Sequence, residues 1–230
     1  MSYTGLGAYP PQLPPRRPSR APLWIALAVV AVLAAVVGVV AFTLLGDHEG
    51  QAGTPAPTST SPAPDWLAVE DDEAGLRYEL PPSWEEGGTG ALGRLRITGS
   101  HVSRPFQCQG RDMVQAQAVA GSVASGNAEE IATDVVNRLA RGGYTVDGTA
   151  PGIGEPRVET SDDRVVVSVE VTPKAVNACY APGAVVTAVA LRKGSKTAVF
   201  ALNVAQGGPH AAQGPAEDDV RRILEGVRLT

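Results

Sequence analysis

The stretch "GAVVTAVALRKGSKTAVFALNV", residues 183–204, decides the fold of this chain. Its two halves, 183–192 and 196–204, are rich in β-branched and small apolar residues and flank the turn "KGS". This pattern predicts an antiparallel hairpin. Phe200 and Leu202 recur at alternate positions in the second half, so we expect them to share one face of a sheet.

Further strand and helix patterns surround this hairpin in blocks. Asn127 is expected to cap a helix over 127–143, because Glu130 follows it at the capping-box spacing. A second helix is predicted over 214–229. Alternating apolar positions predict additional strands at 75–80, 92–98, 113–123 and 164–172. Strands in runs with helices between the runs predict an α+β fold, an antiparallel sheet with two packed helices.

An uncharged segment near the N-terminus predicts a membrane anchor. Leu23 to Leu45 is long enough to cross the hydrocarbon core as a helix. A signal peptide is the rival reading, but its apolar region is shorter and ends at a small-residue cleavage site. Arginines precede the segment and acids follow it, so we expect a cytoplasmic N-terminus and an external C-terminal part. The expected location is the plasma membrane, in a single pass.

Four parts of the chain follow from these patterns. A Pro-rich, disordered cytoplasmic tail covers residues 1–22, and the transmembrane helix covers 23–45. A disordered Thr/Ser/Pro-rich tether is expected over 46–65. The remaining residues, 66–230, are predicted to form one external α+β domain.

The charge of the chain argues against nucleic acid as a partner. Its formal net charge is −5, whereas a surface that binds nucleic-acid phosphates is basic. The expected partners are the membrane, through Leu23 to Leu45, and an envelope protein or cell-wall component. The oligomeric state is left open.

Two motifs at the ends of the external domain resemble a known family. "GLRYELPPSW" is an alternating strand that ends in proline and then tryptophan, and "DDVRRILEGVRL" is a helix with a short strand. Over Leu76–Trp84 and Val220–Leu229 they resemble the two ends of Mog1/PsbP-like domains. The order of tail, helix, tether and two-cysteine domain also resembles a group of actinobacterial membrane proteins of unknown function. The resemblance implies a fold and carries over no catalytic residue.

The sequence contains no recognisable catalytic motif. His48, His101 and His210 have no second ligand at a metal-binding spacing, and each is expected in a surface loop. The chain also lacks a G-x-S-x-G elbow and the glycine-rich phosphate loops. We therefore expect no catalytic, cofactor-binding or metal-binding residue, no cofactor and no enzyme activity.

The two cysteines are interpreted through the predicted topology. Cys108 and Cys179 both fall in the external part, where the surroundings are oxidising. An internal disulfide is the favoured reading, with an intermolecular bridge and a reactive thiol as alternatives. Each cysteine precedes a predicted strand by about five residues, so we expect both at one end of the sheet.

These features favour a membrane-anchored envelope domain that binds or scaffolds an unknown ligand. One alternative is an extracellular or cell-wall hydrolase whose nucleophile and base are scattered in the sequence. Another is an envelope sensor that relays a signal through the cytoplasmic tail.

Overall fold

A computed structural model describes residues 65–174 and 178–230 of the chain. The predicted tail and transmembrane helix, and all but the last residue of the tether, lie outside the described residues. Within the described part, no helix is both long enough and apolar enough to cross a membrane. The same part folds as an α+β domain whose paired strands all run antiparallel, which confirms the predicted fold class.

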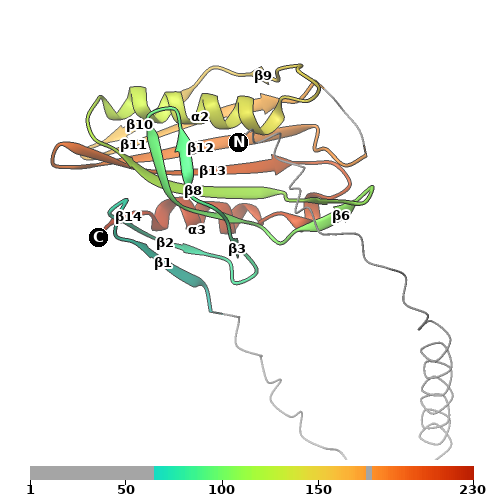
Figure 1. The fold of residues 1–230 in the computed structure, drawn as a ribbon, viewed down its shortest axis with the longest axis horizontal. Helices are drawn as coiled ribbons and strands as arrows, with labels where there is room; N and C mark the ends of the chain where they lie inside the picture. The colour runs from blue at the N-terminus through green and yellow to red at the C-terminus, as the bar shows by residue number, and fades with distance from the viewer. Residues whose placement is uncertain (1–64, 175–177) are drawn as a thin grey trace, which may run out of the picture. The chain divides into compact units, whose positions relative to one another are not determined.

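A nine-stranded sheet forms the centre of this domain (Figure 1). Two short strands, β4 (Gly90–Leu92) and β9 (Gly152–Ile153), pair with β5 and β11. The other strands run in the spatial order β10 (Arg157–Ser161), β11 (Arg164–Thr172), β12 (Gly183–Lys193), β13 (Lys196–Gln206), β8 (Ala116–Val123), β5 (Leu95–Val102) and β3 (Glu85–Glu86).

The remaining elements lie on or beside this sheet. The helices are α2 (Ala128–Tyr144), α3 (Glu217–Gly226) and the short 3-10 helix η1 (Ala211–Gln213). A separate hairpin consists of β6 (Phe106–Cys108) and β7 (Arg111–Met113). A second sheet has the strand order β1 (Leu67–Asp71), β2 (Leu76–Leu80) and β14 (Arg228–Leu229).

The predicted hairpin of residues 183–204 is the pair β12–β13. It turns at Gly194, whose φ of 64° is the left-handed conformation that glycine adopts most easily. The ladder then pairs eleven residues, from Lys193↔Lys196 to Gly183↔Gln206. Most side chains of both strands are buried, because layers of structure cover both faces of the sheet.

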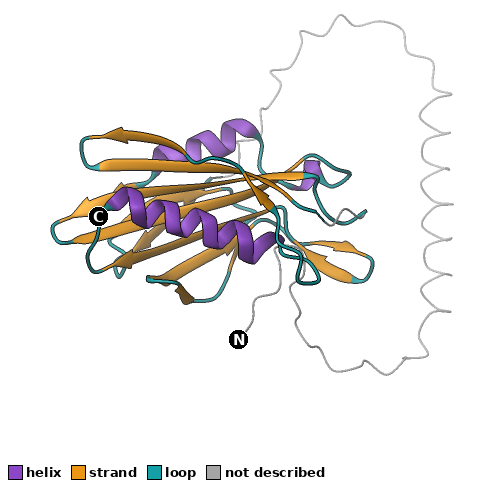
Figure 2. Cartoon of the chain, turned by 90° about the horizontal axis from the view of Figure 1, so that it is seen from above, coloured by secondary structure: helices purple, strands orange, loops and turns teal. Residues whose placement is uncertain are grey.

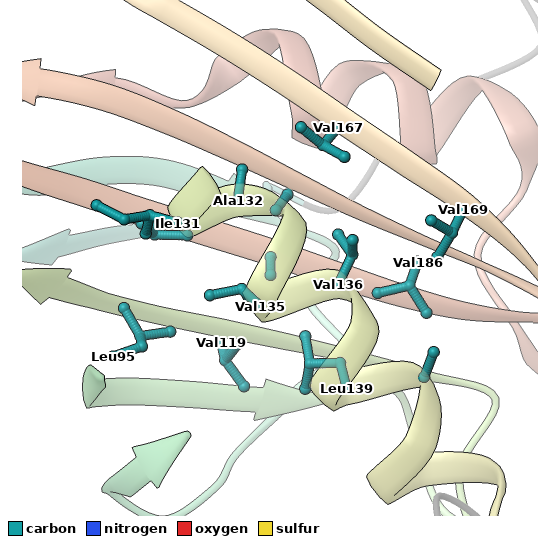
Figure 3. Packing of buried hydrophobic residues seen from close by; sticks show 14 of the residues in the cluster. Leu95, Val119, Ile131, Ala132, Val135, Val136, Leu139, Val167, Val169 and Val186 are labelled. Atoms are coloured by element: carbon teal, nitrogen blue, oxygen red, sulfur yellow. The ribbon is translucent and has the colours of Figure 1, made fainter. Parts of the chain in front are cut away.

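Helix α2 covers one face of the main sheet. Asn127 caps it as predicted, since Asn127 Oδ1 accepts hydrogen bonds from the backbone N–H groups of Glu129 (2.8 Å) and Glu130 (3.2 Å). Its apolar side packs on alternate residues of the strands beneath (Figure 3). The buried residues of this layer include Leu95, Val119, Ile131, Ala132, Val135, Val136, Leu139, Val167, Val169 and Val186.

The opposite face is covered by α3 and the small sheet. Phe200 and Leu202 point into this layer, as the alternation predicts. They meet Leu76, Tyr78, Leu80, Trp84, Ile223 and Val227. The end of α3 is held by Arg164, which donates hydrogen bonds to the carbonyl oxygens of Leu224 (2.6 Å) and Val227 (3.1 Å).

Several elements differ from the sequence predictions. The strand predicted over 92–98 is divided between β4, which ends at Leu92, and β5, which covers Leu95–Val102. The strand predicted over 113–123 begins at Ala116, because residues 111–113 pair within the β6–β7 hairpin. The last helix covers Glu217–Gly226 rather than 214–229. Strand β10 was not predicted, since all five of its residues are exposed and it carries no apolar alternation.

His101 lies in strand β5 and is 8% exposed, so its expected place in a surface loop is wrong. Its ring meets the edge of Tyr78, with centroids 6.2 Å apart, and Glu86 is its partner on β3. Burial lowers the pKa of His101 below its usual value, and the nearby Glu86 partly opposes this shift. The imidazole is therefore held in its neutral form within the sheet.

We expect Gly121→Ala to destabilise the domain by about 1–3 kcal/mol, because it over-packs the β5–β8 contact. A Cβ at this position would lie 2.1 Å from the carbonyl oxygen of Arg96, and backbone must move to admit it. Gly90→Ala is the matched strand control, since nothing lies within 4 Å of its added Cβ. Urea unfolding of the full chain measures both, and equal effects would contradict the assigned packing.

The lowered pKa of His101 predicts a specific pH dependence of stability. Above about pH 6.5 the residue is neutral in both states; below it the unfolded chain takes up the proton first. Stability is thus lost as the pH falls from about 6.5 toward the lower folded pKa. Urea unfolding at pH 7.5, 6.5 and 5.5 should show a steeper loss for wild type than for His101→Asn. His210→Asn, which keeps His101, should follow wild type; parallel curves for all three would refute this prediction.

Candidate functional site

The two cysteines meet at one end of the main sheet. Cys108 ends strand β6, and Cys179 lies in the segment that leads into β12. Their sulfur atoms are 2.07 Å apart and their Cα atoms 5.7 Å apart, so the predicted pair lies at disulfide distance. The link joins two segments that are 71 residues apart in the sequence.

A third segment joins the cysteines at this end, which we call the disulfide end. It follows β13 and contains η1, and it touches each of the other two segments. Phe106 on β6 stacks with His210, with ring centroids 4.4 Å apart. Gly207, at a φ of 74°, lies against Pro182, so a Cβ there would be strained and close to the proline ring. Figure 2 shows the β6–β7 hairpin and the short helix at the same end of the sheet.

A small cavity lies at this end of the sheet, and we call it the Gln115 cavity. Its volume is ≈ 20 Å³, which admits one water-sized group. The residues that line it are Met113, Val114, Gln115, Tyr144, Cys179, Tyr180, Ala181, Asn203 and Ala205. None of them carries a formal charge, so the cavity favours a neutral group over an ion.

The backbone of Gln115 is fixed from two sides. Ser103 Oγ accepts hydrogen bonds from the backbone N–H groups of Gln115 (3.1 Å) and Ala116 (3.0 Å). The carbonyl oxygen of Gln115 accepts a hydrogen bond from the N–H of Ala205 at 2.8 Å. The side chain is only 4% exposed, yet its Oε1 accepts no hydrogen bond from the described residues. A buried acceptor in this condition costs about 1–3 kcal/mol.

Tyr144 and Asn203 form the polar wall opposite. The Tyr144 hydroxyl donates a hydrogen bond to Asn203 Oδ1 at 2.8 Å, in a fully buried pair. Burial raises the pKa of Tyr144 to about 12. The phenol therefore stays neutral and keeps donating. Because this bond occupies the amide oxygen of Asn203, the two N–H groups of the amide remain as donors.

The sequence predicted the cysteines of this site but not its hydrogen-bonding residues. Asn203 was the visible signal, since it interrupts the apolar run "AVFALNVA" of strand β13. Tyr144 ends helix α2 and meets Asn203 only through the tertiary fold, across 59 residues of sequence. Gln115 gave no signal, because it lay inside the strand predicted over 113–123, whereas the structure places it between β7 and β8.

The other candidate residues are not brought together. His101 lies in β5 and His210 stacks on Phe106, while His48 is outside the described residues. Asp71 belongs to the acidic stretch "EDDE", residues 70–73, and has structural partners. Its two oxygens accept hydrogen bonds from Ala74 N (2.9 Å) in the following turn and from Thr98 Oγ1 (2.6 Å) on β5. Within residues 65–174 and 178–230, no three His, Cys, Asp or Glu residues are grouped so that they could hold a metal ion.

Comparisons with solved structures find partial likenesses at low identity. The solution structure of cyanobacterial PsbP from Synechocystis is 12% identical, with 79% of this chain and 100% of that chain covered and a TM-score of 0.47. The Ran-binding protein Mog1p of Saccharomyces cerevisiae is 11% identical, covers 72% of this chain and 95% of its own, and has a TM-score of 0.43. PsbP and Mog1, the two proteins in the name of the family that the sequence resembles, are thus both found among these structures. Their TM-scores lie below 0.5, so neither a function nor an interface is transferred from them.

Sequence comparison gives the family directly. No curated protein matches the chain. A family model described as a domain of unknown function, DUF8017, matches residues 59–230, which is well over half of the sequence. The chain therefore belongs to the DUF8017 family.

Proposed function

We propose that this protein is a membrane-anchored binding module of the cell envelope. Residues 23–45 would cross the plasma membrane once, with the N-terminus in the cytoplasm and the tether and C-terminal domain outside. The disulfide end of that domain is its ligand-binding surface. The cytoplasmic tail sets the topology through its arginines and needs no partner of its own.

One observation carries the binding role: a cavity lined in part by Gln115, whose buried Oε1 accepts no hydrogen bond from the described residues. At the same end, three segments from distant parts of the sequence are tied together by the cysteine pair and the Phe106–His210 stack. Loops held by a rigid sheet are the usual place for recognition. Pre-ordering them lowers the entropy cost of binding.

The chemistry of the cavity favours binding over catalysis. Its lining supplies hydrogen-bond groups and apolar surface, but it does not pair a nucleophile with a base. Cys179 lies at disulfide distance from Cys108 and is no thiolate nucleophile in that state. The neutral phenol of Tyr144 is committed to Asn203.

The topology predicts how the cysteines react in intact cells. Cells that express the full chain are treated with a membrane-impermeant maleimide, with and without a membrane-impermeant reductant. We expect labelling of Cys108 and Cys179 only after reduction, because both lie outside and are paired.

Two single-cysteine variants, made in a Cys108→Ser/Cys179→Ser background, calibrate this assay. Ser61→Cys in the tether should react in intact cells, and Ser19→Cys in the tail only after lysis. Reaction of the native cysteines only after lysis would place the domain inside and overturn the proposal.

Loss of the cysteine pair should also lower stability. The chain-entropy model gives about 4 kcal/mol for a loop of this length, since the reduced unfolded chain gains conformational freedom. Urea unfolding of the Cys108→Ser/Cys179→Ser variant should reveal that difference from oxidised wild type. Reduced wild type serves as the control and should match the variant. A difference below about 1 kcal/mol would mean that the unfolded chain gains little freedom from losing the link.

A further inference from the structure

We infer that strand β1 is the interface of a homodimer, in which it pairs antiparallel with β1 of a second copy of this chain. It is an edge strand of the small sheet, and its one strand neighbour among the described residues is β2. Figure 1 shows β1 as the lowest strand of the domain, with β2 between it and α3. The inference goes beyond the proposed binding role and does not depend on the disulfide end.

Strand β1 lacks most of the features that protect a sheet edge from pairing, which include short length, proline, lysine and bulges. It has five residues, Leu67–Asp71, in unbroken register with β2, and its charged residues are confined to the last two positions. The other edge strands of the described part have two or three residues, except β10. Strand β10 follows Pro156 and carries Arg157 and Glu159. The edge of β1 is therefore the one suited to receive another strand.

Leu67 is a large apolar side chain that a single copy leaves in water. It is 40% exposed, and Val158 on β10, at 41%, is the other exposed large hydrophobic residue within 65–174 and 178–230. Leu67 lies opposite Leu80, which is fully buried, so both side chains project from the inner face of the small sheet. A strand added at the open edge would give Leu67 an apolar neighbour on that face.

The hydrogen-bond pattern of the small sheet shows which backbone groups of β1 are free. The Thr230 N–H donates to the carbonyl oxygen of Gly75 at 3.2 Å, in line with the register of β14 on β2. Alternate residues of a strand direct their backbone groups to opposite sides, so residues 76, 78 and 80 of β2 face β1. Their partners on β1 are Asp71, Val69 and Leu67. The N–H and C=O groups of Ala68 and Glu70 therefore point to the free edge.

Two antiparallel registers use these free groups, one centred on Ala68 and one on Val69. Centring on Ala68 places Leu67 opposite Val69 of the partner subunit, so apolar side chains meet on the inner face. Centring on Val69 would place Leu67 opposite Asp71 of the partner subunit, where a carboxylate replaces the apolar neighbour. The sequence of β1 therefore selects the register centred on Ala68.

Charge complementarity supports the same register. It places Trp66, which directly precedes β1, opposite Glu70 of the partner subunit. Arg222 covers the Trp66 ring, with its guanidinium carbon 3.9 Å from the ring centroid. Arg222 also pairs with Glu79 at 2.7 Å, and a guanidinium has further N–H donors for a second carboxylate. Glu70 of the partner subunit thus approaches a cation.

The size of the contact indicates a reversible dimer. Stable interfaces bury about 1,200–2,000 Å² in total, and two paired five-residue strands bury less than that. The experiment therefore traps the dimer covalently.

The test is disulfide cross-linking with copper phenanthroline in intact cells that express the full chain. Ala68→Cys places two introduced cysteines opposite each other, with Cα atoms about 5.5 Å apart, which a disulfide can span. Glu70→Cys is the matched control on the same face of β1, since its introduced cysteines would lie about 14 Å apart. We expect a reducible dimer from Ala68→Cys and none from Glu70→Cys. Wild type should also give none, because its two cysteines lie at disulfide distance within one chain.

Substitution of Leu67 tests the inner face of the pairing. Leu67→Lys, added to Ala68→Cys, should lower the yield of dimer about tenfold, because a charge replaces the apolar neighbour of Val69. Val158→Lys is the matched control at an equally exposed edge position and should leave the yield unchanged. Urea unfolding verifies that both variants fold, and Leu67→Thr serves if Leu67→Lys does not.

Three outcomes would overturn the inference. They are absence of dimer from Ala68→Cys, an equal yield from Glu70→Cys, and a yield that substitution of Leu67 does not lower. Mass spectrometry of the product identifies the joined peptides. Capture of a different protein by Ala68→Cys, in place of a second copy, would also overturn the inference, because it would assign this edge to another partner.

Discussion

The burial of strand β13 on both faces is the constraint on which the rest of the domain depends. Val199 and Ala201 face helix α2, while Phe200 and Leu202 face α3 and the small sheet. A strand of this kind needs a layer of structure on each side, because water on either face would expose a row of apolar side chains. The two helices therefore lie on opposite faces of one sheet, as Figure 1 shows. The same strand continues to Asn203, so the core and the candidate site share one element.

Local patterns predicted the parts of the fold whose burial is regular. The β12–β13 hairpin was predicted from two apolar, β-branched runs that flank a turn, and helix α2 from its period of 3.6 residues. Both were confirmed. Strand β10 was missed because all five of its residues are exposed to water, so its sequence carries no alternation of apolar and polar residues. The start of β8 was wrong because the β6–β7 hairpin takes Met113 out of the strand. That choice is made by pairing between segments, which a single stretch of sequence does not encode.

The candidate site divides in the same way. The pairing of its cysteines could be predicted because the expected oxidising compartment and the number of two cysteines both favour a disulfide. Its hydrogen-bonding residues could not, since Gln115, Tyr144 and Asn203 come from a loop, a helix end and a strand. A lone glutamine near a strand is ordinary in sequence. It becomes informative only when the fold buries it and leaves its Oε1 without a donor.

Strand β10 lies at one edge of the main sheet, and its free backbone edge affects how copies of this domain can associate. The register Ser161↔Arg164 across a two-residue turn directs the backbone groups of residues 157, 159 and 161 toward β11. The free edge is then a short interval at Val158 and Thr160, closed on one side by Pro156, which has no N–H. Arg157 and Glu159 add charge along the strand. Under the proposed anchoring, neighbouring copies at the same height above a bilayer would meet edge to edge, and this edge offers them too little free backbone to form an intermolecular sheet.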